Sequence, residues 1–350
     1  MLRIRRRLLV KSVKILLLKP SSLGDVVQAL PVLRLLKLHL PESNIYWWIE
    51  SRLAPLLDGD PDLSGVIKFH RGGWSRPQSW VFFWRSIRWM RNQEFDWVID
   101  LQSLLRSGVV AWLANGKLTV GLDEPREGAR GFYDVIISRP SYYTHAVDWY
   151  LNVLKYLQIP IERRFDWLPR RAEIVAALNA KWHLDDQRWL ILQPGARWPN
   201  KRWPIEYYSA LVRELCAMHR SRRIAILGGR EDAELGRQIS QADPESCLDL
   251  TGKLTLPEMV EWIRRCDLMV TNDTGPMHVA AALGKPVVAL FGPTEPRRTG
   301  PYGQLAHVLQ ASLPCVPCMR PRCTYVKPFE CLRVLAPSLV ADAVNEHLYS

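Results

Sequence analysis

A single carboxylate, Asp25, lies in a stretch of sequence that suits both proton transfer and the binding of a charged ligand. The stretch "KPSSLGD" (19–25) follows an apolar run and precedes residues with helical spacing. Gly24 allows a ligand to approach the backbone, and the beginning of a helix favours negative charge. Two roles for Asp25 stay open at this place: it can cap the helix, or it can act as a general base at a ligand site.

A second stretch, "QPGARWPNKRWP" (193–204), gathers cations beside a turn of small residues. Gly195 and Ala196 form the turn, and Arg197, Lys201 and Arg202 follow it. Guanidinium and ammonium groups bind phosphate oxygens through charge-assisted hydrogen bonds. The cations either form a solvated loop or bind a diphosphate, and their position directly after an apolar run favours the diphosphate.

A third stretch, "NDTGPMHVAAALG" (272–284), begins with an acid, Asp273, and continues into a short Ala-rich run. We expect a helix to begin here, with exposed backbone amides at Thr274, Gly275, Met277 and His278. A helix start without bulky side chains binds anions. For His278 a second interpretation stays open, that of a histidine satisfied within the core. The bent backbone is expected where a charged ligand docks.

The elements that position these stretches alternate between apolar and amphipathic runs. Apolar runs predict strands at 14–19, 45–50, 65–70, 97–102 and 118–123, and again at 189–195, 223–229, 247–252, 267–273 and 286–292. Helical spacing lies between them, for example at 25–40, 78–92, 104–115 and 144–158. Strand and helix in alternation predict parallel sheets covered on both faces. The fold class is therefore α/β, with two doubly wound, Rossmann-like domains.

The boundary between the domains is expected in "QIPIERRFDWLPRRAE" (158–173), a segment rich in proline and charge. We place an N-terminal domain at 1–165 and a C-terminal domain at 166–350. The C-terminal helix is expected to pack back on the N-terminal domain. Doubly wound sheets bind ligands beyond the carboxyl ends of their strands. A substrate is therefore expected in a central cleft that both domains face.

The composition restricts the classes of protein that remain. Of the 350 residues 48% are hydrophobic and 23% are charged, which argues against a disordered chain. Apolar runs are shorter than the roughly 20 residues that a membrane-spanning helix needs. The basic start is interrupted by Lys11 and Lys14, which indicates a cytoplasmic arm rather than a signal peptide. The net charge of +12 favours nucleic acid, an anionic membrane surface or phosphorylated substrates as partners.

Aromatic residues and arginines are interleaved in the predicted helix "WSRPQSWVFFWRSIRWMRN" (74–92). One interpretation is a buried helix whose arginines point to water. The other is a patch that holds the protein at the anionic inner face of the cytoplasmic membrane and guides a phosphorylated lipid acceptor. The arginines concerned are Arg76, Arg85, Arg88 and Arg91, and the basic arm adds Arg3, Arg5, Arg6 and Arg7. Each cation near such a surface contributes about 1 kcal/mol.

Four of the seven cysteines fall close together near the C-terminus. Their spacing, C-x2-C-x4-C-x7-C, is compatible with a structural zinc ion or an iron–sulfur cluster. Reduced thiols or a disulfide are the alternative, and the surrounding prolines predict a rigid loop. The four are Cys315, Cys318, Cys323 and Cys331. The scattered Cys216, Cys247 and Cys266 are expected to be buried in a reducing compartment.

Along nearly its whole length the sequence resembles the heptosyltransferases, glycosyltransferase family nine, which are similar in fold to other GT-B transferases. The resemblance is carried, in this order, by "KILLLKPSSLGDVVQALPVLRLL", "FDWVIDLQSLLRSGVVAWLANGKLTVGLD", "HAVDWYLNVLKYLQIP", "LQPGARWPNKRWP" and "TNDTGPMHVAAALGKPVVALFGPTEPRRTGPYG". It implies transfer of a heptose or similar sugar from an ADP-sugar to the lipopolysaccharide inner core. It also implies inversion at the anomeric carbon, with no metal or other cofactor required for catalysis.

The resemblance implies that the N-terminal domain, 1–165, is acceptor-binding and that the C-terminal domain, 166–350, is nucleotide-sugar-binding. It implies roles for individual residues as well. Asp25 would be the general base that deprotonates the acceptor hydroxyl, and Lys201 would bind the donor diphosphate. Asp232, or its neighbour Glu231, would lie near the donor ribose. Where some members carry hydroxyl residues, this chain has "GARWPN", so amides and a guanidinium would contact phosphate instead. The implied donor-binding residues are Gly195, Arg197, Lys201, Asp232, Asp273, Thr274, Gly275 and His278, and the implied acceptor-binding residues are Ser22, Gly24, Arg126 and His145.

Two other classes of function compete with sugar transfer. A nucleic-acid-binding protein would explain the net charge, but the cations are spread over the loops of two sheet domains without a recognisable binding module. A nicotinamide oxidoreductase would explain the doubly wound domains, but neither first βα turn contains G-x-G-x-x-G. We therefore expect an ADP-sugar donor, a lipid-linked phosphorylated saccharide acceptor and an anionic inner-membrane surface as partners, and no nucleic acid. The expected location is cytoplasmic, peripheral on the inner face of the cytoplasmic membrane.

Overall fold

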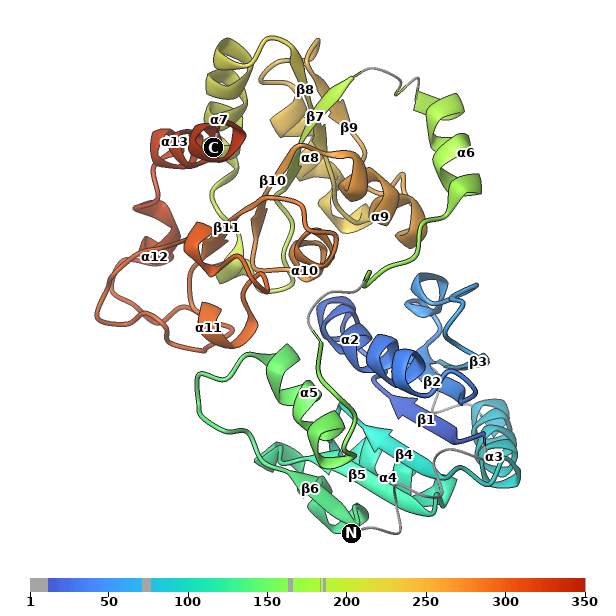
Figure 1. Cartoon of the computed structure of the whole chain (residues 1–350). Helices are drawn as coiled ribbons and strands as arrows, with labels where there is room; N and C mark the ends of the chain where they lie inside the picture. The colour runs from blue at the N-terminus through green and yellow to red at the C-terminus, as the bar shows by residue number, and fades with distance from the viewer. Residues whose placement is uncertain (1–11, 71–76, 163–165, 183, 185–186, 350) are drawn as a thin grey trace. The chain divides into compact units, whose positions relative to one another are not determined.

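The structure, a computed structural model, describes residues 12–70, 77–162, 166–182, 184 and 187–349. The chain divides into two compact units, Met1–Pro169 and Arg170–Ser350, and each is described by itself (Figure 1). The basic arm and Arg76 lie outside the described residues. The binding roles expected for the two units, and the cleft expected between them, stay predictions.

The first unit is built on a parallel sheet whose strand order is β3-β2-β1-β4-β5-β6. The chain order reverses between the neighbours β1 and β4, which pair from Ile15 with Trp97 to Leu18 with Asp100. Both strands are apolar and almost wholly buried, because helices cover both faces of the sheet. The strands are β1 (Lys14–Leu18), β2 (Asn44–Glu50), β3 (Gly65–Phe69), β4 (Trp97–Asp100), β5 (Leu118–Leu122) and β6 (Val135–Ile137).

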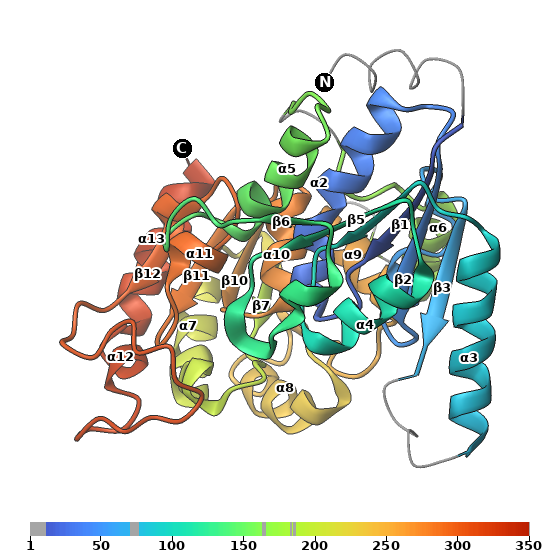
Figure 2. The same ribbon diagram turned by 90° about the horizontal axis from the view of Figure 1, so that it is seen from below.

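Two pairs of helices cover this sheet. On one face α2 (Leu23–His39) packs with α5 (Ala146–Tyr156), and on the other α3 (Pro77–Asn92) packs with α4 (Leu105–Ala114). Ile87 and Met90 of α3 contact Leu18 and Trp48 of the sheet in one core. Figure 2 shows α3 along the outer side of the unit, next to β2 and β3. Short 3-10 turns complete the unit at η1 (Ala54–Leu56), η2 (Pro125–Glu127) and η3 (Ala129–Phe132).

The second unit repeats this plan, with the strand order β12-β11-β10-β7-β8-β9. Here the order reverses between β7 and β10, which pair from Leu190 with Leu268 to Gln193 with Thr271. The strands are β7 (Arg188–Gln193), β8 (Arg222–Ile226), β9 (Cys247–Asp249), β10 (Leu268–Asn272), β11 (Val287–Phe291) and β12 (Val308–Gln310). Each unit is thus doubly wound, as predicted.

Helices again cover both faces of the second sheet. On one face lie α7 (Ile205–Met218), α8 (Ala233–Ser240) and α13 (Pro337–Tyr349), and on the other α6 (Ala172–Trp182), α9 (Leu256–Arg265) and α10 (Gly275–Ala282). Val340 and Val344 of α13 belong to the core of this unit, and the expected packing of α13 on the first unit stays a prediction. Shorter helices are α11 (Pro296–Thr299), α12 (Glu330–Arg333), η4 (Pro199–Lys201), η5 (Arg230–Asp232) and η6 (Leu305–His307).

A buried ion-pair network fixes α2 to the turns after β2. The guanidinium of Arg34 donates to both carboxylate oxygens of Asp60, at 2.7 and 2.5 Å, and to Asp62 at 2.6 Å. It also donates to the carbonyl of Trp167 at 3.1 Å. Burial alone would lower the pKa of Arg34, but the two carboxylates outweigh it and raise the pKa. The network therefore joins three segments that are distant in the sequence.

Replacing Asp60 with Asn should lower the free energy of unfolding by about 3 kcal/mol, because a buried guanidinium loses its bidentate partner. Denaturant titration followed by tryptophan fluorescence measures this loss. Asp58→Asn is the matched control: Asp58 pairs with Lys68 at the surface, and such pairs contribute about 1 kcal/mol or less. Equal losses in the two variants would contradict a specific role for the buried network.

Candidate functional site

In the first unit a buried lysine bridges the two central strands where the strand order reverses. Lys19 follows β1, and its Nζ donates at 2.8 Å to the carbonyl of Leu101, which follows β4. The ammonium group lies 4.7 Å from the centre of the Tyr150 ring in α5. Burial alone would lower the pKa of Lys19, but Tyr150, Asp25 and Asp100 outweigh it and raise the pKa. A fixed positive charge therefore lies beside the loop that carries Asp25.

Asp25 lies in the first turn of α2 and completes a capping box with Ser22. Its Oδ2 accepts the backbone N–H of Ser22 at 2.9 Å and the Ser22 hydroxyl at 2.7 Å. Its Oδ1 lies 4.0 Å from Nζ of Lys19, and the side chain is 40% exposed. Gly24, directly before it, is buried. A carboxylate that caps the helix is thus also accessible to a ligand, so the two roles considered for Asp25 are compatible.

Two other residues expected at the acceptor lie in loops that follow strands of the same sheet. His145 caps α5: its Nδ1 accepts the backbone N–H of Val147 at 3.2 Å, which places the hydrogen of a neutral ring on Nε2. Arg126, in the turn after β5, pairs with Glu124 at 2.9 Å. The hydrogen bond that Arg126 donates to Glu124 raises the pKa of Arg126 against its burial, and Asp25 adds to the rise. The charges of Arg126 and Asp25 therefore interact.

A buried carboxylate that the sequence analysis did not single out, Asp100, organises the loop after β4. It accepts the backbone N–H of Ser103 at 3.0 Å and the hydroxyl of Tyr133 at 2.8 Å. Burial raises the pKa of Asp100, and the bonds from Ser103 and Tyr133 oppose the rise. Because Asp100 is fully buried, it holds the loop that presents the Leu101 carbonyl to Lys19 and does not itself face a ligand.

In the second unit an ion pair bridges the corresponding reversal between β7 and β10. Lys201 lies in the turn after β7, and its Nζ contacts Oδ2 of Asp273, which directly follows β10, at 2.5 Å. The same oxygen accepts the hydroxyl of Thr294, after β11, at 2.6 Å. The ammonium group also lies 4.7 Å from the centre of the Trp198 ring. Three loops at the carboxyl edge of the sheet thus converge on one carboxylate.

The buried amide of Asn272 fixes the loop after β7 at two points. Its Oδ1 accepts the backbone N–H of Trp203 at 3.2 Å, and its Nδ2 donates to the carbonyl of Pro194 at 2.7 Å. Within the same turn Arg202 donates through Nε to the carbonyl of Ala196 at 2.7 Å. The turn after β7 is therefore held at both ends, and Lys201 is directed toward the end of β10.

Asp232 packs against the glycine turn that follows β7. Its Oδ2 accepts the backbone N–H of Gly229 at 3.0 Å, whereas its buried Oδ1 has no hydrogen-bond partner among the described residues. A Cβ on Gly195 would lie 2.2 Å from Oδ2 of Asp232, so this close approach requires glycine. Burial raises the pKa of Asp232, and the Gly229 bond opposes the rise. An acceptor atom left without a partner suits a ligand hydroxyl.

The N-terminus of α10 directly follows Asp273. Thr274 is the N-cap and Gly275 the first helical residue, and the first turn carries no acidic side chain. The helix dipole therefore leaves partial positive charge beside the ion pair. His278 is buried in α10, so the choice between a core and a ligand-binding histidine stays open. Arg197 is exposed in the turn after β7. The structure thus gathers the expected donor-binding residues along one edge of the second sheet.

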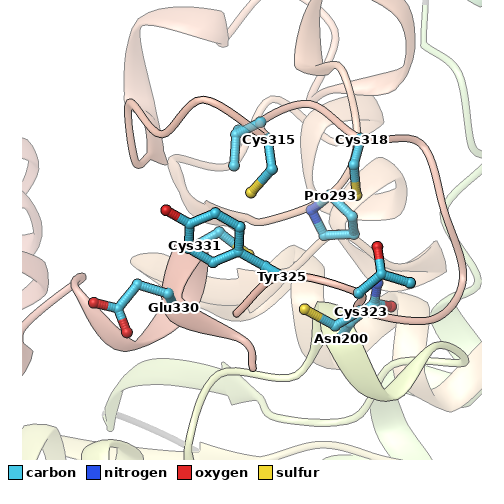
Figure 3. Close-up of a pocket in the computed structure, with 10 residues that line it drawn as sticks. Asn200, Pro293, Cys315, Cys318, Cys323, Tyr325, Glu330 and Cys331 are labelled. Carbon is cyan, nitrogen blue, oxygen red and sulfur yellow. The ribbon is translucent and has the colours of Figure 1, made fainter. Parts of the chain in front are cut away.

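The four clustered cysteines line one small pocket in the second unit (Figure 3). The pocket has a volume of about 30 Å³, and Asn200 and Pro293 also line it. All four cysteines, Cys315, Cys318, Cys323 and Cys331, are free thiols. The described residues include no group of three or more His, Cys, Asp or Glu side chains close enough together to hold a metal ion, and this applies to the four cysteines as they stand. The cysteines therefore share a pocket, and a metal between them stays a prediction.

Comparison with known proteins decides the family. A profile of glycosyltransferase family 9 (heptosyltransferase) matches residues 83–328. The chain belongs to this family. Over 323 residues it is 30% identical to lipopolysaccharide heptosyltransferase 1 of Pseudomonas aeruginosa, covering 89% of this chain and 88% of that protein. It is 29% identical to lipooligosaccharide heptosyltransferase 2 of Haemophilus influenzae, covering 85% of this chain and 88% of that protein. The chain is therefore a glycosyltransferase, as its resemblance implied.

Solved structures of the family share the fold. ADP-heptose lps heptosyltransferase II of Escherichia coli superposes with a TM-score of 0.77 at 24% identity, covering 96% of this chain and 98% of that one. Heptosyltransferase WaaC of the same organism, solved with ADP, gives 0.77 at 23% identity, with 95% and 99% covered. The expected GT-B fold is confirmed. The roles assigned to single residues stay predictions.

Several groups of this site were not predicted from the sequence. Lys19 and Tyr150 were missed as partners because their contact joins the end of β1 to α5. Thr294 and Asn272 were missed although both lie within the quoted family motif. The available signal was positional: each polar residue directly after a buried strand lies at the ligand-binding edge of a doubly wound sheet.

Lys201→Met should lower the free energy of unfolding by about 3 kcal/mol, because the buried carboxylate of Asp273 is left without its cation. The double variant Lys201→Met/Asp273→Asn should recover most of this loss, since it removes the unpaired charge and Thr294 can still bond the amide oxygen. Thermal and denaturant unfolding of the four proteins of this double-mutant cycle measure the coupling. Additive losses at the two positions would show that the pair is not formed.

Proposed function

We propose that this protein transfers a heptose from ADP-heptose to the inner core of lipopolysaccharide, with inversion at the anomeric carbon and without a catalytic metal. The observation that carries the proposal is the convergence of Lys201, Asp273 and the start of α10 at the strand-order reversal of the second unit. Family membership supports it, because relatives are lipopolysaccharide heptosyltransferases, and WaaC was solved with ADP and with ADP-2-deoxy-2-fluoro heptose.

In the proposed reaction the second unit binds the donor. The diphosphate lies against the ammonium group of Lys201 and the backbone amides of Thr274 and Gly275, where cation and helix dipole both favour negative charge. Asp232 accepts a ribose hydroxyl through its buried Oδ1, which has no partner among the described residues. Arg197, exposed beside the glycine turn, supplies a second cation to the phosphates.

The first unit supplies the base. Asp25 accepts the proton of the acceptor hydroxyl, whose oxygen attacks the anomeric carbon from the face opposite the departing ADP. The bond from that carbon to the diphosphate breaks, and the electron pair leaves with ADP. The Ser22 bonds to Oδ2 fix the orientation of the carboxylate, and Lys19 balances its charge. A positioned base typically contributes about 100- to 10,000-fold in rate.

Charge stabilisation of the leaving group completes the mechanism. As the glycosidic bond breaks, negative charge grows on the diphosphate. Fixed donors and cations that face this charge lower the barrier without reorganisation. In many transferases a divalent cation supplies this stabilisation. Here Lys201, Arg197 and the amides at the start of α10 supply it in the proposed reaction.

Asp25→Asn should lower turnover about 100- to 10,000-fold, because the amide cannot accept the acceptor proton. Its affinity for ADP should stay unchanged, since Asp25 acts on the acceptor. Release of ADP from ADP-heptose in the presence of a lipid-linked acceptor measures turnover, and titration calorimetry measures ADP affinity. A variant that retains full turnover would exclude Asp25 as the base.

The double variant Lys201→Met/Asp273→Asn, which is expected to fold, tests the donor site in the same way. Its ADP affinity should fall about 10- to 100-fold, as expected for a lost charge-assisted contact. Asp58→Asn should change neither quantity. Unchanged ADP affinity in the double variant would reject the diphosphate site, whatever the result for Asp25.

We propose further that the exposed face of α3 binds the anionic surface of the membrane that carries the acceptor. Ile87 and Met90 are buried, whereas Trp80, Phe82 and Trp84 are exposed, Phe82 by 66%. Arg85, Arg88 and Arg91 are exposed on the same helix. Aromatic side chains flanked by cations suit the boundary between headgroups and acyl chains. No described helix is both long and apolar enough to cross a bilayer.

A groove beside α3 extends this face. It has a volume of about 630 Å³, and Phe82, Arg85 and Trp89 of the helix line it together with Tyr46 of β2 and Ile67 of β3. Its wall therefore combines aromatic side chains with a guanidinium, which suits a phosphorylated, lipid-linked molecule. The sequence contains no recognisable nucleic-acid-binding module, so the exposed aromatic residues favour this surface over nucleic acid as the partner.

Phe82→Ala/Trp84→Ala should lower co-sedimentation with phosphatidylglycerol vesicles at least about tenfold, since each buried aromatic side chain contributes about 2 kcal/mol. Tyr156→Ala, which removes an aromatic residue exposed on α5, is the matched control and should bind normally. Binding should weaken with added salt and require anionic lipid. Loss of binding only after deletion of residues 1–8 would assign attachment to the basic arm and contradict the role of α3.

A further inference from the structure

The loop between β12 and α12 carries three of the four clustered cysteines and contains no helix or strand over residues 311–329. Cys315 and Cys318 lie on one limb of this loop, and Cys323 lies on the other (Figure 3). Cys331 is buried in α12 beside them. We propose that these four thiols bind one zinc ion, which cross-links the loop to α12 and to the turn that carries Lys201.

The lining of the pocket supplies four ligands of one kind. The four cysteines line it together with Asn200, Pro293 and Glu330. Four cysteine thiolates around one ion form the tetrahedral environment that structural zinc prefers.

Polar groups around the pocket match the surroundings of a metal–thiolate site. The backbone N–H of Phe329 donates to Sγ of Cys323 at 3.4 Å, and such bonds stabilise thiolate charge in metal sites. Asn200 is 2% exposed and lines the pocket. Its Nδ2 donates to the carbonyl of Arg320 at 2.8 Å, while its buried Oδ1 has no partner among the described residues. Asn200 therefore joins the pocket to the cysteine loop, and its Oδ1 can accept a hydrogen bond from a water.

The loop also needs a cross-link on physical grounds. Long segments without regular structure are uncommon in compact domains unless something holds them. Cys315, Cys318 and Cys323 are only partly buried, so apolar burial contributes little at these positions. A zinc ion offsets the entropy of ordering such a loop, because binding and folding of a metal site are coupled.

Ion binding draws the thiols inward and releases their protons. The thiols line the wall of the pocket, whereas side chains already at ligand spacing are absent from the described part of the chain. Zn²⁺ replaces the proton of each of the four thiols, so a tetrathiolate of charge −2 forms and four protons are released. The ion thereby cancels the repulsion that four thiolates exert on one another.

The position of the pocket gives the ion a positioning role at the donor site. Asn200 is the neighbour of Lys201, and its side chain bonds the cysteine loop. The backbone N–H of Met319 donates to the carbonyl of Pro293 at 2.7 Å. Pro293 directly precedes Thr294, which bonds Asp273. Movement of the loop would therefore shift both Lys201 and the Thr294 partner of Asp273.

The full chain should be purified anaerobically, without a metal-chelating column, and analysed for zinc, iron and acid-labile sulfide. We expect about one zinc per chain, as for a structural four-cysteine site. Cys318→Ser and Cys323→Ser should each lose most of the zinc. Cys216→Ser is the matched control, because Cys216 is a partly buried free thiol on α7, away from the pocket, and should keep its zinc.

Limited trypsin digestion gives a readout that does not depend on the variants folding. Arg322 is exposed in the loop, whereas the bonds after Arg320 and Lys327 precede proline and resist trypsin. Removal of zinc from the wild type by a chelator should increase cleavage after Arg322 at least about tenfold, because the loop opens, and added zinc should reverse the change. Iron with sulfide, a disulfide found by mass analysis after alkylation, or a zinc-free wild type with unchanged cleavage would each overturn the proposal.

Discussion

In each unit a lysine bridges the two strands between which the strand order reverses, and the position of the site depends on these two bridges. At a reversal the loops of neighbouring strands turn to opposite faces of the sheet, so a crevice is left beyond the strand ends. In the first unit Lys19 joins the ends of the two strands by a hydrogen bond to the carbonyl of Leu101. In the second unit Lys201 joins them by an ion pair with Asp273. Each lysine is held by groups that are far away in the sequence. The Asp25 loop and the start of α10 are positioned beside these fixed charges.

The sheets could be predicted from the sequence because parallel strands buried on both faces read as continuous apolar runs. β1, β4, β10 and β11 all follow this rule. The strands β6 and β12 were not predicted. Each has three residues, lies at an edge of its sheet and is not fully buried, so its sequence carries too few apolar positions for a period to be recognised. The prediction therefore lacked one edge strand of each sheet, whereas the opposite edge strands, β3 and β9, and the central strands were predicted.

The site was predictable where function depends on backbone and motif, and not where it depends on long-range contacts. Gly195 was expected to form a turn. The structure adds the physical reason that glycine is required there: a Cβ at this position would lie 2.2 Å from Oδ2 of Asp232. The proximity of the four cysteines followed from their spacing. That Asn200 lines their pocket and also adjoins Lys201 could not, because more than a hundred residues separate Asn200 from Arg320, whose carbonyl it bonds. Spacing predicts neighbours along the chain and not partners across it.

The pairing of Lys201 with Asp273 has a consequence for how a diphosphate is bound in the proposed reaction. A lysine neutralised by a carboxylate adds little net charge, so the long-range attraction of an anion to this edge comes from Arg197 and the helix start of α10, and Lys201 contributes a direct contact to the bound phosphate. A phosphate that binds there competes with Asp273 for the ammonium group. Loss of Lys201 alone would leave a buried carboxylate unpaired, but the hydroxyl of Thr294 continues to donate to the same oxygen, which lowers the penalty. In the proposed reaction Thr294 therefore holds Asp273 when Lys201 turns from the protein's own carboxylate to the ligand.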